Sequence, residues 1–356
     1  MADKPIQIRS NLAVVQDHSR QFADFTFVYP VISRRSRGLS IGINLNPDKV
    51  CNFDCVYCEV DRRIPGTVSK LDLNQMRDEL KAMIHFVRDG GLAKEPKFDE
   101  LPSFITRNVK DIAFSGDGEP TLIHNFAECV QVVADVKRVE GLAKTRIVLI
   151  TDAAGLDKAD VRRGLEIMDA NNGEVWGKLD AGTETYFKRV NRTTVRFDRI
   201  LKNLAETARV RPIVIQSLFL RIRDEAMPLG ELQAYCDRLN EIVRGGGQVK
   251  EVHAHTVARP TPEPFAARLS AEELRTLTET IRPGPAWRSS RSTDKWYSRA
   301  YPWPSPAGRK KKAQRFNAGN KRPRRRVPSG TTEAHDRGAI LSSLRDLARL
   351  RIGSQR

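Results

Sequence analysis

Short apolar runs and longer amphipathic stretches alternate along the chain from residue 39 to residue 282. The runs have the length of strands, with two-residue alternation in 39–45 and 174–180, and the stretches repeat apolar residues at helical spacing. The predicted strands cover residues 39–45, 111–115, 146–150, 174–180, 213–220 and 249–257. The predicted helices cover residues 71–87, 125–140, 158–168, 184–189, 197–208, 229–244 and 271–281.

This alternation predicts both the class and the architecture of the fold. Strands joined by helical crossovers pair in parallel, and the crossovers are right-handed. Six such units predict an α/β protein, an incomplete (β/α)6 TIM-like barrel with parallel strands over residues 39–282, after an N-terminal extension over residues 1–38. In such barrels the chemistry lies at the C-terminal ends of the strands. Functional residues are therefore expected in the loops that follow the strands.

The last segment, residues 283–356, differs in composition and carries most of the net charge of +17. It holds 19 Lys and Arg against 4 Asp and Glu, whereas residues 1–282 hold 42 against 40. Such a segment cannot bury enough apolar surface to offset the entropy of ordering, so we expect a disordered basic tail. Three of the four tryptophans lie in it, which is unusual for a linker. Out-of-frame translation of a GC-rich gene is a hypothesis that resequencing tests.

No membrane segment or secretory signal is predicted. No stretch reaches the roughly 18–20 continuous apolar residues of a membrane helix, and the N-terminus lacks the apolar run of a signal peptide. We therefore expect a cytoplasmic protein without a membrane partner. In that compartment the five cysteines do not predict a disulfide framework.

Three of these cysteines, Cys51, Cys55 and Cys58, stand within eight residues, after the first predicted strand. Thiolates at this spacing suit a four-iron cluster, in which three ligands leave one iron open for chemistry. A zinc site, a redox pair and inert structural cysteines are the alternatives. A closed zinc site needs four ligands, and no nearby histidine has a suitable spacing. The remaining two, Cys129 and Cys236, are too few for a second cluster.

The Cys-x3-Cys-x-aromatic-Cys run, with Tyr57 in the aromatic place, resembles the radical S-adenosylmethionine (SAM) superfamily. Segments 30–35 (PVISRR), 42–45 (GINL) and 114–122 (FSGDGEPTL) resemble a group of Fe–S oxidoreductases related to the tRNA-wybutosine synthases. The likeness covers about residues 25–282 and not the tail. It implies one [4Fe-4S] cluster that cleaves SAM reductively, and a 5′-deoxyadenosyl radical that abstracts hydrogen from a substrate.

The resemblance also implies where SAM is held. In the family, the glycine-rich turn after the second strand binds the SAM amino group, and here that turn reads Gly116-Asp117-Gly118-Glu119. The two glycines permit a close backbone approach to a ligand, and Glu119 offers an acceptor for an ammonium. A plain strand-to-helix turn is the alternative for this motif.

Polar residues at the ends of later strands complete the predicted site. Lys178 and Asp180 share one face of the fourth strand, where the family places contacts to the SAM ribose and carboxylate; a mutual ion pair is the alternative. His253 and His255 share a face of the last strand and either meet the substrate or line the barrel mouth. The predicted SAM-binding residues are Tyr57, Gly116, Asp117, Gly118, Glu119, Thr151, Lys178, Asp180 and Gln216.

Two functions from different classes follow. The first is a radical SAM enzyme supplied by an external electron donor of the flavodoxin or ferredoxin type, since no flavodoxin-like domain precedes the barrel. A nucleotide or a tRNA base is the substrate that the family analogy suggests. The second is a nucleic-acid-binding protein with a structural metal site, whose basic tail contacts phosphates. Formation of 5′-deoxyadenosine from SAM distinguishes the two.

Overall fold

The computed structural model describes residues 20–281, apart from residues 21, 34, 35, 37, 67, 69 and 260. The chain divides into two compact units, Met1–Tyr301 and Pro302–Arg356. Every described residue belongs to the first unit. The expected disorder of residues 283–356 and most of the expected N-terminal extension lie outside the described residues.

A single sheet runs through this unit in the order β1-β2-β3-β4-β5-β6-β7, and β2 to β7 pair in parallel. Each crossover therefore leads to the adjacent strand, as the alternation predicts. The protein is a mixed α/β protein with a largely parallel sheet. The strands are β1 (Val28–Ser33), β2 (Gly38–Ile43), β3 (Val109–Phe114), β4 (Arg146–Thr151), β5 (Gly173–Lys178), β6 (Ile213–Ile222) and β7 (Val249–Thr256).

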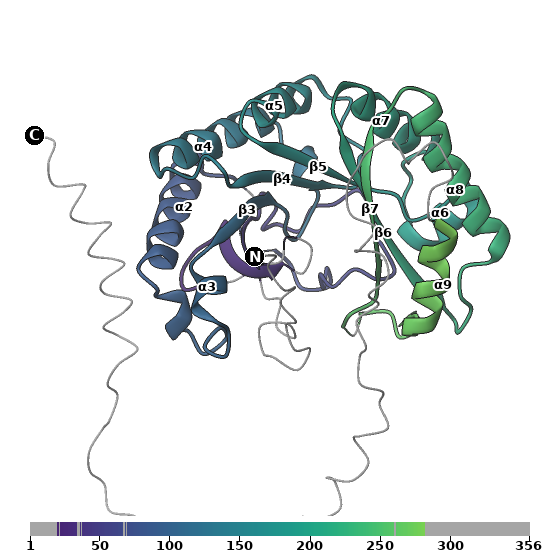
Figure 1. Ribbon diagram of the computed structural model, residues 1–356, viewed down its shortest axis with the longest axis horizontal. Coiled ribbons are helices and arrows are strands. Elements are labelled where there is room, and N and C mark those ends of the chain that lie inside the picture. The colour runs from purple at the N-terminus through teal and green to yellow at the C-terminus, as the bar shows by residue number, and fades with distance from the viewer. Residues whose placement is uncertain are drawn as a thin grey trace, which may run out of the picture. The chain divides into compact units, whose positions relative to one another are not determined.

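Helices follow the strands and line the outer side of the curved sheet (Figure 1). They are α2 (Leu73–Arg88), α3 (Ser103–Thr106), α4 (Phe126–Val139), α5 (Ala159–Asp169), α6 (Glu184–Asn191), α7 (Phe197–Val210), α8 (Leu229–Arg244) and α9 (Ala271–Ile281), with short 3-10 turns at Leu92–Lys94 and Pro120–Leu122. Within the described ranges, no helix combines the length and apolar character needed to span a bilayer.

Two strands were not predicted, and both pair in antiparallel fashion. β1 lies within the expected N-terminal extension and pairs with β2 along its whole length. Its proline, Pro30, argues against a strand in the sequence, but an edge strand tolerates a residue that cannot donate a hydrogen bond to the sheet. The short strand β8 (Ala266–Arg268) pairs with the end of β6. The sheet therefore extends beyond the six predicted parallel strands.

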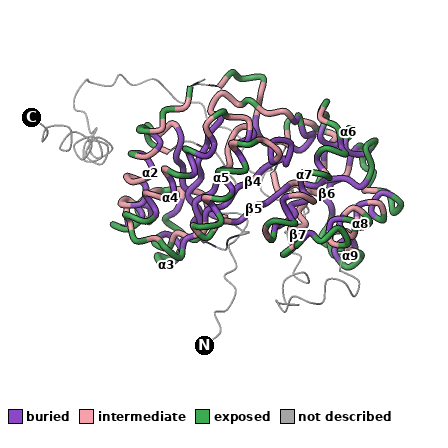
Figure 2. The backbone as a smooth tube through the Cα atoms, turned by 90° about the horizontal axis from the view of Figure 1, so that it is seen from above, coloured by how far each residue is buried: buried purple, intermediate pink, exposed green. Residues whose placement is uncertain are grey.

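The two faces of the sheet have different surroundings, because successive side chains point to opposite faces. On the helix-covered face, a Cβ added to Gly177 would lie 2.4 Å from Leu204 Cδ2 of α7, so the helix packs closely on the strand there. On the other face, Ala113, Val148, Trp176 and Val214 form a buried cluster across four strands. Figure 2 shows buried residues along the strands and exposed residues on the outer helices.

Candidate functional site

The cysteine loop leaves the C-terminal end of β2 and is anchored by backbone hydrogen bonds on two sides. The amide of Asp54 donates to Asn191 (3.0 Å) and that of Val56 donates to Val190 (2.9 Å), both at the end of α6. On the other side, the amide of Glu119 donates to the carbonyl of Val50 (3.1 Å). Because backbone bonds hold the loop from two elements, the cysteine positions are fixed by the fold and not by the loop alone.

Each of the three predicted cluster ligands accepts an N–H hydrogen bond at its sulfur. Cys55 is buried and accepts from Asn191 Nδ2 at 3.3 Å. Cys58 is half-buried and accepts from Arg62 Nη1 at 3.0 Å. The third, Cys51, is also half-buried and accepts from the amide of Phe53 at 3.5 Å. These donors favour the thiolate form, which is the form that ligates metals.

Burial opposes that form in the metal-free protein. Desolvation raises the pKa of Cys51 to about 12 and that of Cys55 to about 11. In the metal-free protein the thiols of Cys51 and Cys55 are therefore protonated at neutral pH. A metal that binds them displaces these protons, so metal binding and proton release are coupled.

The donor set has the chemistry that an iron–sulfur cluster requires, since a four-iron cage takes a separate sulfur at each iron. Soft sulfur ligands with N–H donors and two nearby cations, Arg62 and Lys178, suit an anionic cluster.

Lys178 and Asp180 at the end of β5 are each bound to the cysteine loop through Tyr57. The Lys178 ammonium lies 4.7 Å from the centre of the Tyr57 ring, while the Tyr57 hydroxyl donates to Asp180 Oδ2. Asp180 also accepts from Asn191 Nδ2 at 2.9 Å and from the amide of Leu218 at 2.8 Å. The two strand residues are thus partnered separately, through tyrosine, asparagine and backbone.

The same network shifts the pKa values of its members. Burial alone lowers the pKa of Lys178, but the surrounding Cys55 and Asp180 raise it above its usual value. Burial, followed by the charge of Asp180, raises the pKa of Tyr57 well above its usual value. At neutral pH the site therefore contains the ammonium of the half-buried Lys178 and a neutral phenol.

The glycine-rich turn after β3 packs against the cysteine loop. A Cβ on Gly116 would lie 2.2 Å from Asn44 Oδ1, and a Cβ on Gly118 would lie 2.0 Å from the carbonyl oxygen of Val50. The prediction gave these glycines a close approach to a ligand. The close approach that the structure shows is to the loop that carries the cysteines, so the turn and the loop form one unit.

Asp117, between the glycines, strengthens this connection. Its carboxylate accepts from Asn44 Nδ2 at 2.7 Å and from Arg20 Nη1 at 2.8 Å. Its carbonyl oxygen accepts from Arg62 Nη2 at 3.3 Å. Arg62 consequently bridges the turn and Cys58 with two nitrogens of one guanidinium.

Glu119 is buried and accepts four hydrogen bonds from its own chain. Its Oε1 accepts from the amide and the hydroxyl of Thr121, at 3.1 and 2.7 Å, and from the hydroxyl of Thr151 at 2.6 Å. Its Oε2 accepts from the amide of Asp152 at 2.8 Å. Burial, followed by the nearby Glu119 charge, raises the pKa of Asp152 well above its usual value. The predicted residues Glu119 and Thr151 thus lie together beneath the turn.

Gln216 and the two histidines lie on the inner face of the sheet. Gln216 of β6 is in register with Lys178 on one side and with His253 on the other. The His253 ring meets Trp176 edge-on, with 5.0 Å between ring centres, and its Nε2 pairs with Glu251. The predicted residues of β5, β6 and β7 therefore form one polar row across the sheet.

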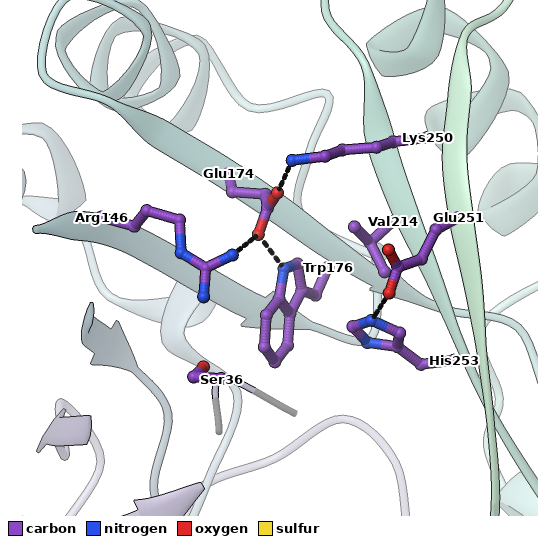
Figure 3. A pocket seen from close by; sticks show the side chains of 8 residues that line it. All are labelled: Ser36, Arg146, Glu174, Trp176, Val214, Lys250, Glu251 and His253. Atoms are coloured by element: carbon purple, nitrogen blue, oxygen red, sulfur yellow. Dashed lines mark hydrogen bonds and ion pairs between the residues drawn. The ribbon is translucent and has the colours of Figure 1, made fainter. Parts of the chain in front are cut away.

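A cavity of about 220 Å³ opens at the other end of the strands. In it, the buried Glu174 carboxylate accepts from Arg146, from Trp176 Nε1 and from Lys250 (Figure 3). Glu174 thus pairs with two cations at the N-terminal ends of β4, β5 and β7, where barrels keep stabilising interactions. The lining residues are Ser36, Arg146, Glu174, Trp176, Val214, Lys250, Glu251 and His253.

Two residues that the sequence reasoning did not select contact the cysteine sulfurs. Arg62 stands four residues after Cys58 and had a usable signal, its closeness to the cysteines. Asn191 lies 136 residues from Cys55 and had none. Residues that meet only through packing cannot be found from local spacing.

No family model matches the chain. A UPF0026 protein of Methanocaldococcus jannaschii is 32% identical over 177 residues, which covers 49% of this chain and 47% of the relative. The GTPase Obg of Brachyspira hyodysenteriae is 26% identical over 249 residues, 69% of this chain and 32% of the relative. A UPF0026 protein of Helicobacter pylori is 23% identical over 252 residues, 69% of this chain and 70% of the relative. The chain thus spans about half the length of the first relative and about a third of the second.

Solved structures give weaker similarities. TYW1 with a lysine-pyruvate adduct bound has a TM-score of 0.45 at 15% identity, covering 69% of this chain and 73% of that chain. A radical SAM methyltransferase from Sphaerobacter thermophilus has a TM-score of 0.47 at 14% identity, covering 72% and 66%. TM-scores below 0.5 do not carry a mechanism over to this chain.

A parallel α/β sheet with a three-cysteine loop at the C-terminal end of a strand is what the radical SAM resemblance implies, and the chain resembles that superfamily in both. UPF0026 proteins are among its sequence relatives.

Proposed function

We propose that this protein is a radical SAM enzyme built on a partial (β/α)6 barrel, with one [4Fe-4S] cluster held by Cys51, Cys55 and Cys58. The observation that carries the proposal is the shared environment of the three sulfurs. Each accepts an N–H hydrogen bond, and the loop is tied by the Val50 carbonyl to the glycine-rich turn. Three structural cysteines without a common ligand would need neither these N–H donors nor the hydrogen bond that joins the loop to the glycine-rich turn.

The cluster, when bound, would supply the electron that cleaves SAM reductively and produces a 5′-deoxyadenosyl radical. The protein binds, orients and shields. The Lys178 ammonium, half-buried beside the cysteines, suits a carboxylate of SAM. The tyrosine and carboxylate network below it orients Cys55 through Asn191. The SAM-binding set that we propose remains Tyr57, Gly116, Asp117, Gly118, Glu119, Thr151, Lys178, Asp180 and Gln216.

The substrate, electron donor and location are proposals that rest on the sequence. The wybutosine-synthase-like resemblance favours a nucleotide or a tRNA base as substrate. A donor of the flavodoxin or ferredoxin type would supply the electron, and the cytoplasm is the expected location. Comparing the modified nucleosides of tRNA from a deletion strain with those of its parent tests the substrate.

Anaerobic reconstitution of the full chain tests the enzyme. The reconstituted protein is reduced with dithionite and given SAM, and 5′-deoxyadenosine is measured. We expect product from the wild type and from Cys236→Ser, a cysteine on α8 outside the loop, and none from Cys58→Ser. A wild-type protein that carries four irons and four sulfides and still yields no product would refute the proposal.

A further inference from the structure

Arg62 connects the cysteine loop to the glycine-rich turn through two hydrogen bonds. Its Nη1 donates to Cys58 Sγ at 3.0 Å, and its Nη2 donates to the carbonyl of Asp117 at 3.3 Å. Both bonds come from one planar guanidinium, which holds its donors in a fixed relation. The cation is therefore kept at the cysteine sulfur and does not move freely over the surface.

The other two sulfur contacts are neutral. Cys51 accepts from the backbone amide of Phe53 and Cys55 from the side-chain amide of Asn191. Of these three donors Arg62 alone brings a full positive charge to its sulfur. Its neighbour in sequence, Arg63, behaves differently: its side chain is 80% exposed and pairs with Asp61 at 2.9 Å. Two adjacent arginines thus differ in contact and burial.

We propose that Arg62 is a positioning residue that sets the reduction potential of the cluster, and this inference rests on the proposed function. Reduction adds one negative charge to the cluster. A cation that is hydrogen-bonded to a ligand sulfur stabilises the reduced form, because hydrogen bonds to sulfur and net charge are what tune these potentials. Arg62 therefore raises the midpoint potential and makes the cluster easier to reduce.

The test is a redox titration of the reconstituted full chain without SAM, in which the electron paramagnetic resonance signal of the reduced cluster is measured at each potential. The variants are Arg62→Gln, which removes the charge, Arg62→Lys, which keeps it, and Arg63→Gln as the matched control. We expect Arg62→Gln to lower the reduced-to-oxidised ratio at a fixed solution potential about tenfold, roughly 59 mV for one electron. The shift for Arg62→Lys should be smaller, and Arg63→Gln should match the wild type.

Iron and sulfide analysis separates the possible failures. A wild type that binds no cluster would refute the proposed function itself. Loaded Arg62 variants with the wild-type midpoint would overturn the inference and leave the proposed function standing. An equal shift in Arg63→Gln would also overturn it, since a distant surface charge would then suffice. If neither Arg62 variant loads a cluster, Arg62 has a structural role and the tuning assignment is wrong.

Discussion

The buried carboxylate of Glu119 offers a sharp test of how the glycine-rich turn is built. In Glu119→Ala, the four groups that donate to this carboxylate lose their acceptor. The hydroxyls of Thr121 and Thr151 can rotate toward other acceptors. The backbone amides of Thr121 and Asp152 cannot, and they remain buried without a partner.

The magnitude follows from those two amides. A buried donor left unsatisfied costs about 1–3 kcal/mol, so two cost about 2–6 kcal/mol. Removing the Glu119 charge also relieves the repulsion that helps to raise the pKa of Asp152, which offsets part of the loss. We therefore expect the free energy of unfolding to fall by about 3 kcal/mol.

This loss is measured without any ligand by urea unfolding of the reduced, metal-free protein, monitored by circular dichroism. Glu128→Ala is the matched control, because Glu128 is an exposed residue on α4, and a surface change of this kind costs less than about 0.5 kcal/mol. Glu119→Gln keeps one acceptor oxygen and should lose less than Glu119→Ala. A Glu119→Ala protein as stable as the wild type would refute the reasoning and would mean that the carboxylate serves a ligand alone.

Two further predictions concern the cysteine loop. Gly118→Ala would bring a methyl group to 2.0 Å from the Val50 carbonyl oxygen. It should lower the free energy of unfolding by about 1–3 kcal/mol and reduce iron retention. The control is Gly230→Ala, whose methyl group meets nothing within 4 Å and should cause neither loss, so equal stability of the two variants would contradict the prediction. Because burial raises the pKa of Cys51 to about 12 and that of Cys55 to about 11, the unfolded thiols, at about 8.5, lose their protons first. The stability that these two thiols contribute to the metal-free protein should therefore be fully present below pH 8.5 and be lost as the pH rises toward 11. Urea midpoints at pH 8 and pH 10 measure this loss, and Cys55→Ser should reduce it.

Much of the fold and the ligand loop could be read from local patterns. The short apolar run at 147–150 indicates a strand buried in a sheet, and the structure places β4 at Arg146–Thr151. The spacing of three cysteines on one loop likewise needs no tertiary contact to be recognised. The strands also lie in the sheet in their chain order, as the predicted barrel requires.

Tertiary structure decided what surrounds those cysteines. Asn191 meets Cys55 only because the end of α6 packs on the loop, and Asp180 is engaged only because Tyr57 reaches across to it. β1 joins the sheet although Pro30 hides it, since an edge strand tolerates a missing donor. The sequence alone determined most of the helices and strands and the three-cysteine loop, because local periodicity and spacing encode them. The donor to Cys55 and the bond between Tyr57 and Asp180 depend on packing between segments 136 and 123 residues apart, which no local pattern records.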